Sequence, residues 1–155
     1  MQEVFWLIPD QLGGRTGPDR RPWDLPAMRA AGVGAILSVN DGLLCHPEDF
    51  AAADIRYACI PLSANAPPQR GDDDLCVRAL PEAHAFVSEQ LAQGRRTVVH
   101  CSSGKDRTGL YLAYHWMKHA GVGPEVAIRA VMRVRPIALS AMGWDEHALD
   151  VLRRC

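Results

Sequence analysis

Short apolar runs of strand length alternate along this chain with segments of helical periodicity. The turn-rich residues 11–24 are predicted to form a loop. Strands are predicted at 5–9, 35–39, 56–62 and 96–100. Helices are predicted at 25–32, 46–53, about 74–94, 107–121, 124–134 and 142–154. This alternation predicts an α/β fold, in which residues 1–155 form a single domain with a central, mostly parallel sheet of four to five strands and helices on both faces.

Composition excludes several classes of protein. The 155 residues are 48% hydrophobic, which suffices for one core. With 17 basic and 18 acidic residues, the net charge of −1 gives no general attraction to nucleic acid or to an anionic membrane. The first residues lack the pattern of a signal peptide, and no stretch approaches a membrane span. We therefore expect a cytoplasmic monomer with no nucleic-acid partner and no stable membrane anchor.

The cysteines are odd in number and scattered. They form no CxxC pair, so neither a disulfide framework nor a zinc site is indicated. No metal or cofactor is therefore expected, and a reducing compartment fits this usage. The five cysteines are Cys45, Cys59, Cys76, Cys101 and Cys155.

The stretch VVHCSSGKDRTG, residues 98–109, ends a predicted strand with a small polar loop that leads into a helix. Such a loop can turn successive backbone N–H groups toward one point, and the start of the helix adds further N–H groups. In an open α/β sheet this position, beyond the carboxyl end of a strand, is where ligands bind. We predict a phosphate-binding site formed by Ser102, Ser103, Gly104, Lys105, Asp106 and Arg107.

The side chains of this stretch suggest catalysis rather than binding alone. Cys101 lies where the N–H groups stabilise a thiolate, which is the nucleophilic form of cysteine. Arg107 can hold two phosphate oxygens in a bidentate fork, and Thr108 can donate a hydrogen bond to the sulfur. Taken singly, a cysteine at a strand end is a small core residue and an arginine in a first helical turn is a solvated charge. Their joint spacing favours the catalytic interpretation.

The stretch resembles the HCxxGxxR[ST]G signature of the cysteine-based protein tyrosine phosphatase superfamily. Its length and the form GKDRTG are similar to the compact dual-specificity branch, and to bacterial members in particular. Residues 57–68, YACIPLSANAPP, resemble the strand and acid loop that precede the signature in that branch. The matching residues are His100, Cys101, Gly104, Arg107, Thr108 and Gly109.

The resemblance implies a metal-independent phosphomonoester hydrolase that acts through a phosphocysteine on phosphotyrosine or other phosphorylated residues of proteins. In this mechanism Cys101 attacks phosphorus, Arg107 and the loop stabilise the oxygens, and His100 and Thr108 support the site. Lys105 resembles the phosphatase-and-tensin type, so a phosphoinositide or another small phosphomonoester is an alternative substrate. A weakly active phosphate-binding or interaction module is an alternative of another class.

The general acid departs from the family pattern, because Ala64 stands where relatives carry an aspartate. Asp106 inside the loop is one replacement. Another is an aspartate among Asp72, Asp73 and Asp74 on a mobile, proline-rich loop, although Asp74 can instead cap the following helix while its neighbours are solvated. The third explanation is that Ala64 is itself a natural or engineered loss of the acid.

Overall fold

The computed structural model describes residues 3–155, and its centre is one five-stranded sheet in the order β1-β2-β5-β3-β4. The pair β1 and β2 is antiparallel, and the other three pairs are parallel. The predicted α/β domain with a mostly parallel sheet is therefore confirmed. The strands are β1 (Phe5–Ile8), β2 (Leu12–Arg15), β3 (Val33–Ser38), β4 (Arg56–Cys59) and β5 (Arg96–His100).

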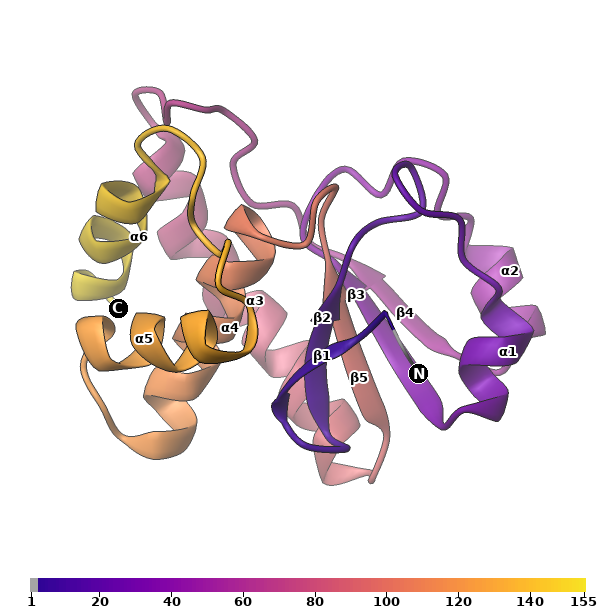
Figure 1. The fold of residues 1–155 in the computed structure, drawn as a ribbon. Coiled ribbons are helices and arrows are strands. Elements are labelled where there is room, and N and C mark those ends of the chain that lie inside the picture. The colour runs from indigo at the N-terminus through magenta and orange to yellow at the C-terminus, as the bar shows by residue number, and fades with distance from the viewer. Residues whose placement is uncertain (1–2) are drawn as a thin grey trace.

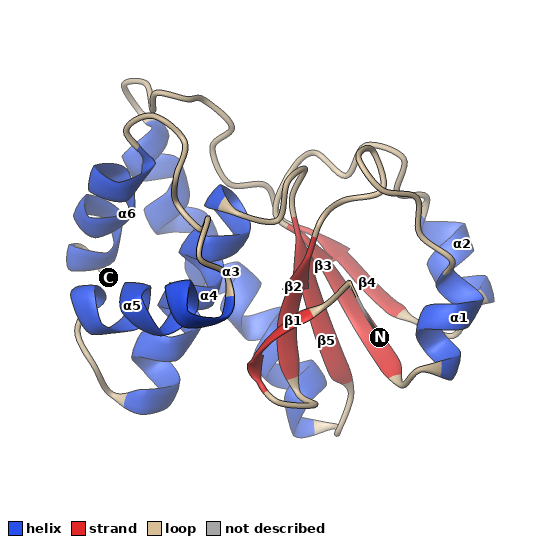
Figure 2. Cartoon of the chain, in the orientation of Figure 1, coloured by secondary structure: helices blue, strands red, loops and turns tan. Residues whose placement is uncertain are grey.

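Helices cover both faces of the sheet, as predicted (Figures 1 and 2). The two short helices α1 and α2 lie on one side, and the four longer helices lie on the other. None of the helices between residues 3 and 155 combines the length and hydropathy needed to cross a bilayer. The helices are α1 (Leu25–Ala30), α2 (Pro47–Ala52), α3 (Asp72–Ala92), α4 (Asp106–Ala120), α5 (Pro124–Val134) and α6 (Trp144–Arg153).

Strand β2 corrects the prediction of an unbroken loop over residues 11–24. Its two glycines suggest a turn in the sequence, but in the fold they make room for a neighbouring strand. A Cβ on Gly13 would collide with the carbonyl oxygen of Phe5, and a Cβ on Gly14 would collide with the Phe5 ring. The strand therefore needs glycine for close packing rather than for a turn.

The sheet brings three strand ends together at its carboxyl edge. In the register of the sheet, Arg15 of β2 and Ser38 of β3 both lie opposite His100 of β5. The chain leaves β5 at this point and enters α4 at Asp106. The predicted site therefore lies at the edge where parallel α/β sheets bind ligands.

Two buried histidines make the stability of this fold depend on pH. Burial lowers the pKa of both His100 and His115 to about 4, from an ordinary value of 6.5. Because the folded state holds them neutral, their contribution is fully present above pH 6.5 and is lost as pH falls toward 4. The loss is about 3 kcal/mol for each histidine. Urea unfolding at pH 7, 5.5 and 4.5 is expected to show this decline. A His115→Gln variant is expected to decline less steeply, and an equal slope would contradict the prediction.

Candidate active site

The loop between β5 and α4, residues 101–107, is called here the cysteine loop. Cys101 at its start is only 2% exposed, and the hydroxyl of Thr108 donates to its Sγ at 3.1 Å. Thr108 lies in the first turn of α4 and is fully buried. The predicted contact between the threonine hydroxyl and the cysteine sulfur is therefore present.

The backbone carbonyl groups at the start of the site all have donors from surrounding segments. The oxygens of His100 and Ser102 accept from N–H groups of the loops that follow β3 and β2. The oxygens of Ser103 and Gly104 accept from the Arg135 side chain, at 2.7 and 3.1 Å. The oxygen of Lys105 accepts from the N–H groups of Gly109 and Leu139. These contacts turn the carbonyl groups away from the centre of the loop.

In contrast to these carbonyl groups, the backbone N–H groups of the same loop lack hydrogen-bond partners among the described residues. From Ser102 to Thr108, none of them donates to another residue within the described range 3–155. The last three open helix α4, where N–H groups lack partners in any helix. A run of unpaired N–H groups around a cysteine forms an anion-binding nest.

Glycine is required at the centre of the cysteine loop. Gly104 has a φ of +65°, in the left-handed region, and a Cβ there would lie 2.7 Å from the carbonyl carbon and oxygen of Arg15. The loop thus packs directly on the end of β2. On its outer side, Ser102 donates to the Asp19 carboxylate at 2.7 Å and accepts from Arg20 at 2.8 Å.

His100 holds the cysteine loop from behind. Burial keeps its imidazole neutral, with the pKa lowered to about 4. Its Nδ1 lies 2.9 Å from the Cys101 carbonyl oxygen, which only accepts, so Nδ1 carries the proton. Its Nε2 then accepts from the Ser38 hydroxyl at 2.5 Å, and Ser38 accepts from Tyr57 at 2.7 Å. This chain of hydrogen bonds fixes the backbone of Cys101.

The charged side chains of the loop differ in whether they have hydrogen-bond or ion-pair partners among residues 3–155. The half-buried Arg107 guanidinium forms no hydrogen bond or ion pair with any residue from 3 to 155, so it is available to an incoming anion. Lys105 donates to the Ser140 hydroxyl at 3.1 Å and lies 3.7 Å from the Asp106 carboxylate. Asp106 also accepts from the Ala141 N–H at 3.2 Å, and its side chain is 16% exposed.

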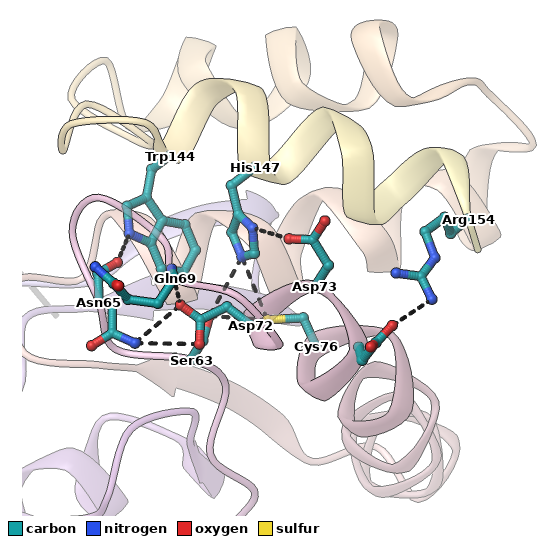
Figure 3. A network of polar contacts seen from close by, with 10 residues as sticks. Ser63, Asn65, Gln69, Asp72, Asp73, Cys76, Trp144, His147 and Arg154 are labelled. Atoms are coloured by element: carbon teal, nitrogen blue, oxygen red, sulfur yellow. Dashed lines mark hydrogen bonds and ion pairs between the residues drawn. The ribbon is translucent and has the colours of Figure 1, made fainter.

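The three aspartates at the start of α3 have structural partners (Figure 3). Asp72 turns toward the loop that precedes α3, where it accepts from the Asn65 amide and from the Gln69 N–H. Asp73 contacts His147 of α6 at 2.9 Å. The position of Asp74 corrects the predicted cap: helix α3 begins at Asp72, with Gly71 as its N-cap.

Position 64, in the segment that precedes α3, holds an alanine, whose side chain cannot donate a proton. This residue is exposed, between Ser63, which lies close to Cys76 and His147, and Asn65, which holds Asp72. Asp74 pairs with Arg154 at 2.8 Å. The aspartates at the start of α3 therefore tie this segment to helix α6.

Sequence reasoning missed the residues that hold the cysteine loop from outside. Arg135 is the clearest example, since it binds two loop carbonyl groups and lies 5.2 Å from the Phe5 ring. Asp19 and Arg20 lie in the segment predicted as a simple loop. No sequence signal distinguishes Arg135 from Arg133, because both are basic residues at the end of the same helical pattern.

An Arg135→Met variant is expected to lower kcat/KM for an aryl phosphate about 10²-fold, since a small displacement of a positioned site has an effect of that size. The thioether side chain keeps much of the bulk but donates to neither loop carbonyl. The matched control is Arg133→Met, an exposed position two residues earlier, which is expected to keep full activity. Equal activities of the two variants would contradict the role of Arg135.

An α/β sheet that presents a cysteine and an arginine on one loop at its carboxyl edge is the arrangement expected of a cysteine-dependent phosphatase. The family described as the "Swiss Army Knife protein, DSP-PTPase phosphatase domain" matches residues 1–149. The chain belongs to this family, whose members are phosphatases of the dual-specificity type. The resemblance drawn from residues 98–109 is confirmed.

Individual relatives agree with this family. The chain is 37% identical over 63 residues to "Protein phosphatase Slingshot homolog 3" of Rattus norvegicus, a match that covers 41% of this chain and 10% of that protein. It is 24% identical over 128 residues to "Phosphatidylglycerophosphate phosphatase PTPMT1" of Arabidopsis thaliana, covering 79% of this chain and 36% of that protein. The chain thus spans about a tenth and about a third of these two relatives.

Solved structures show the same fold. The structure of Tk-PTP in the active form superposes with a TM-score of 0.79 at 17% identity, and the match covers 99% of each chain. Human DUSP28 superposes with a TM-score of 0.73 at 17% identity, covering 99% of this chain and 95% of that one. At this level of identity the likeness concerns the fold.

Proposed function

We propose that residues 1–155 form a catalytic domain that hydrolyses phosphate monoesters through a phosphocysteine, without a metal ion. The observation that carries this proposal is the contrast between the carbonyl groups and the N–H groups of the cysteine loop. Its carbonyl groups have partners outside the loop, whereas the N–H groups of residues 102–108 have none among residues 3–155. A loop held in this way is preorganised for the three equatorial oxygens of a phosphoryl group in transfer.

In the first step the thiolate of Cys101 attacks phosphorus. A bond forms between Sγ and phosphorus while the bond from phosphorus to the leaving oxygen breaks. Arg107 binds two of the remaining oxygens, and the N–H groups of the loop bind all three as charge develops on them. The hydrogen bond from Thr108 to Sγ, at 3.1 Å, supports the thiolate before attack and the departure of sulfur afterwards.

We assign the proton transfers to Asp106. The leaving oxygen takes a proton from this residue, and in the second step water attacks phosphorus, returns a proton to the carboxylate and releases phosphate and the Cys101 thiolate. The competing aspartates at the start of α3 contact residues that lie outside the cysteine loop, namely Asn65, Gln69, His147 and Arg154. Asp106 belongs to the cysteine loop itself, and its contacts with Ala141 and Lys105 orient its carboxylate.

Membership of the family supports a phosphorylated substrate. A dual-specificity phosphatase acts on phosphorylated substrates, and we propose phosphorylated tyrosine, serine or threonine in proteins as the first candidates. The name of the Arabidopsis relative supports a lipid phosphate as a second candidate. Turnover of a phosphotyrosine peptide, a phosphoserine peptide, a phosphoinositide and phosphatidylglycerophosphate by the same preparation would rank these classes.

Hydrolysis of an aryl phosphate by the whole chain tests the proposed activity. We expect saturable release of phosphate that persists in excess EDTA, because no step uses a metal ion. Phosphate binding without turnover would favour an interaction module instead. Activity that disappears with EDTA and returns with a divalent cation would contradict the proposed mechanism.

The Asp106→Asn variant tests the assignment of the general acid. We expect a loss of about 10²-fold or more on an alkyl phosphate, whose leaving group needs a proton. The loss is expected to be only a few-fold on an aryl phosphate with an acidic phenol. Measurement of kcat/KM across a series of leaving groups gives this contrast.

The matched control for Asp106→Asn is Asp19→Asn, which changes a carboxylate on the outer side of the same loop. It is expected to affect all leaving groups alike. Equal losses of Asp106→Asn on both kinds of substrate would assign Asp106 a structural role. A loss confined to poor leaving groups in Asp19→Asn would transfer the acid function to Asp19.

A further inference from the structure

A small apolar cavity lies between the segments that follow β2 and β3. Both segments leave the carboxyl edge of the sheet and lead to α1 and α2 (Figure 1). The cavity volume is about 120 Å³, whereas pockets for drug-sized ligands are about 300–1,000 Å³, so it fits one side chain rather than a whole ligand. Its polar wall residues are His46 and Asp49. The apolar wall residues are Pro18, Trp23, Leu25, Leu44 and Phe50.

The walls of this cavity are continuous with the cysteine loop. The N–H group of Gly17 donates to the carbonyl oxygen of Ser102 at 2.8 Å, and the next residue, Pro18, lines the cavity. The Trp23 ring lies edge-on to the His100 ring, with 4.5 Å between the ring centroids. An extended chain advances about 3.3 Å per residue. A chain bound at the cysteine loop therefore reaches the cavity within a few residues.

Leu44 lies at the cavity on a turn that is fixed by its own hydrogen bonds. The Asn40 amide oxygen accepts from the Gly42 N–H at 3.0 Å, and the Gly42 carbonyl oxygen accepts from the Cys45 N–H at 2.8 Å. Leu44 is 58% exposed and has a φ of +63°, in the left-handed region that bulky residues rarely adopt. Its neighbour Leu43 is 57% exposed but does not line the cavity. Strained backbone of this kind clusters at binding and catalytic sites.

A larger and more open cavity of about 590 Å³ continues from the small one, since both are lined by Trp23, Leu25 and Asp49. Asp24 also lines it. Neither aspartate forms an ion pair with any residue from 3 to 155. The Asp24 carboxylate accepts from the Ala27 N–H at 3.0 Å, which leaves its charge uncompensated by a cation. The two cavities thus join an apolar pocket to a surface with negative charge.

We propose that these two cavities bind the segment of a phosphorylated protein that flanks its phosphorylated residue. An apolar side chain of about the size of leucine fills the small cavity beside Leu44, and a lysine or arginine lies over Asp24 and Asp49. The carboxylates favour a cationic segment of a protein over a phospholipid, whose headgroup phosphates are anionic. This assignment rests on the proposed phosphatase activity and narrows its substrates to proteins with apolar and basic residues near the phosphorylated one.

Turnover of synthetic phosphotyrosine peptides tests the proposal. In an otherwise alanine background, one leucine or one lysine is moved through the positions on either side of the phosphotyrosine. We expect one position at which leucine raises kcat/KM about tenfold over the alanine peptide, because burial of the larger apolar side chain contributes that much. At another position lysine is expected to raise kcat/KM about two- to fivefold. High salt is expected to remove the lysine effect and to keep the leucine effect.

Single substitutions assign the two preferences to the two cavities. Leu44→Ala is expected to abolish the preference for leucine and to keep the preference for lysine, and Asp49→Asn is expected to do the reverse. The matched control is Leu43→Ala, a neighbour of equal exposure outside the cavity, which is expected to keep both preferences. All three variants are expected to hydrolyse a small aryl phosphate as the wild type does, because none of the three residues belongs to the cysteine loop.

The aryl phosphate separates failure of this assignment from failure of the proposed activity. If the wild type hydrolyses the aryl phosphate but turns over all peptides alike, the assignment is overturned and the activity stands. If the aryl phosphate is not hydrolysed, both are overturned. A leucine preference that survives Leu44→Ala, or that Leu43→Ala removes equally, would also overturn the assignment. Vesicle-bound phosphatidylglycerophosphate turned over faster than every peptide, with a rate that falls in Leu44→Ala, would assign the cavities to a lipid instead.

Discussion

The Cys101→Ser variant is expected to lose aryl phosphate hydrolysis by a factor on the order of 10⁵, the scale seen when a nucleophile is removed from a covalent mechanism. A serine hydroxyl is not ionised at neutral pH, so no thiolate-like nucleophile remains. The N–H groups of residues 102–108 and the Arg107 guanidinium are unchanged by the substitution. Inorganic phosphate is therefore expected to bind this variant about as well as the wild type.

Paired measurements separate loss of the nucleophile from loss of the fold. Steady-state hydrolysis gives the first quantity, and phosphate binding by calorimetry together with urea unfolding gives the second. The matched control is Cys76→Ser, a second buried cysteine that lies on α3, which is expected to retain turnover by the folded protein. Residual turnover above about one per cent in Cys101→Ser would contradict the assigned nucleophile.

The Arg107→Lys variant is expected to lower kcat about 10³-fold while the charge at the site is kept. Lysine offers a single ammonium group, which cannot hold two phosphate oxygens in a fork. The Arg107 guanidinium makes no hydrogen bond or ion pair within residues 3–155, so its replacement removes no internal contact of that kind. We therefore expect little change in the free energy of unfolding.

The control for Arg107→Lys is Arg20→Lys, which alters an exposed arginine that contacts the Ser102 hydroxyl from outside the loop. That variant is expected to keep kcat within a few-fold of the wild type. Comparison of kcat and of urea unfolding for both variants distinguishes a loss of transition-state binding from a loss of structure. Equal kcat values for the two variants would contradict the assigned role of Arg107.

The alternation of short strands and helices was enough to predict the α/β class and the edge of the sheet at which the site lies. Strand β2 escaped prediction because Gly13 and Gly14 give the local signal of a turn. Their actual role depends on Phe5 of the neighbouring strand, against which only glycine fits. Information of this kind belongs to a contact between segments and is absent from either segment alone.

The candidate site, like the fold, could be predicted from the sequence only in part. The proposed nucleophile, Cys101, and the proposed phosphate-binding arginine, Arg107, lie within one continuous stretch, so their spacing was sufficient to select them as candidates. The contact of Thr108 with sulfur followed from the same stretch. The support from Arg135 depends on the packing of α5 beside the loop, which sequence spacing does not encode.

Rapid-quench mass spectrometry of the wild-type chain tests the central claim most directly. The protein is mixed with an excess of an aryl phosphate, denatured within the first turnover and digested. We predict a phosphoryl group on the sulfur of Cys101, formed together with the first equivalent of phenol and lost as phosphate appears. Phenol release without phosphorylation of Cys101, or with the phosphoryl group on another residue, would contradict the mechanism.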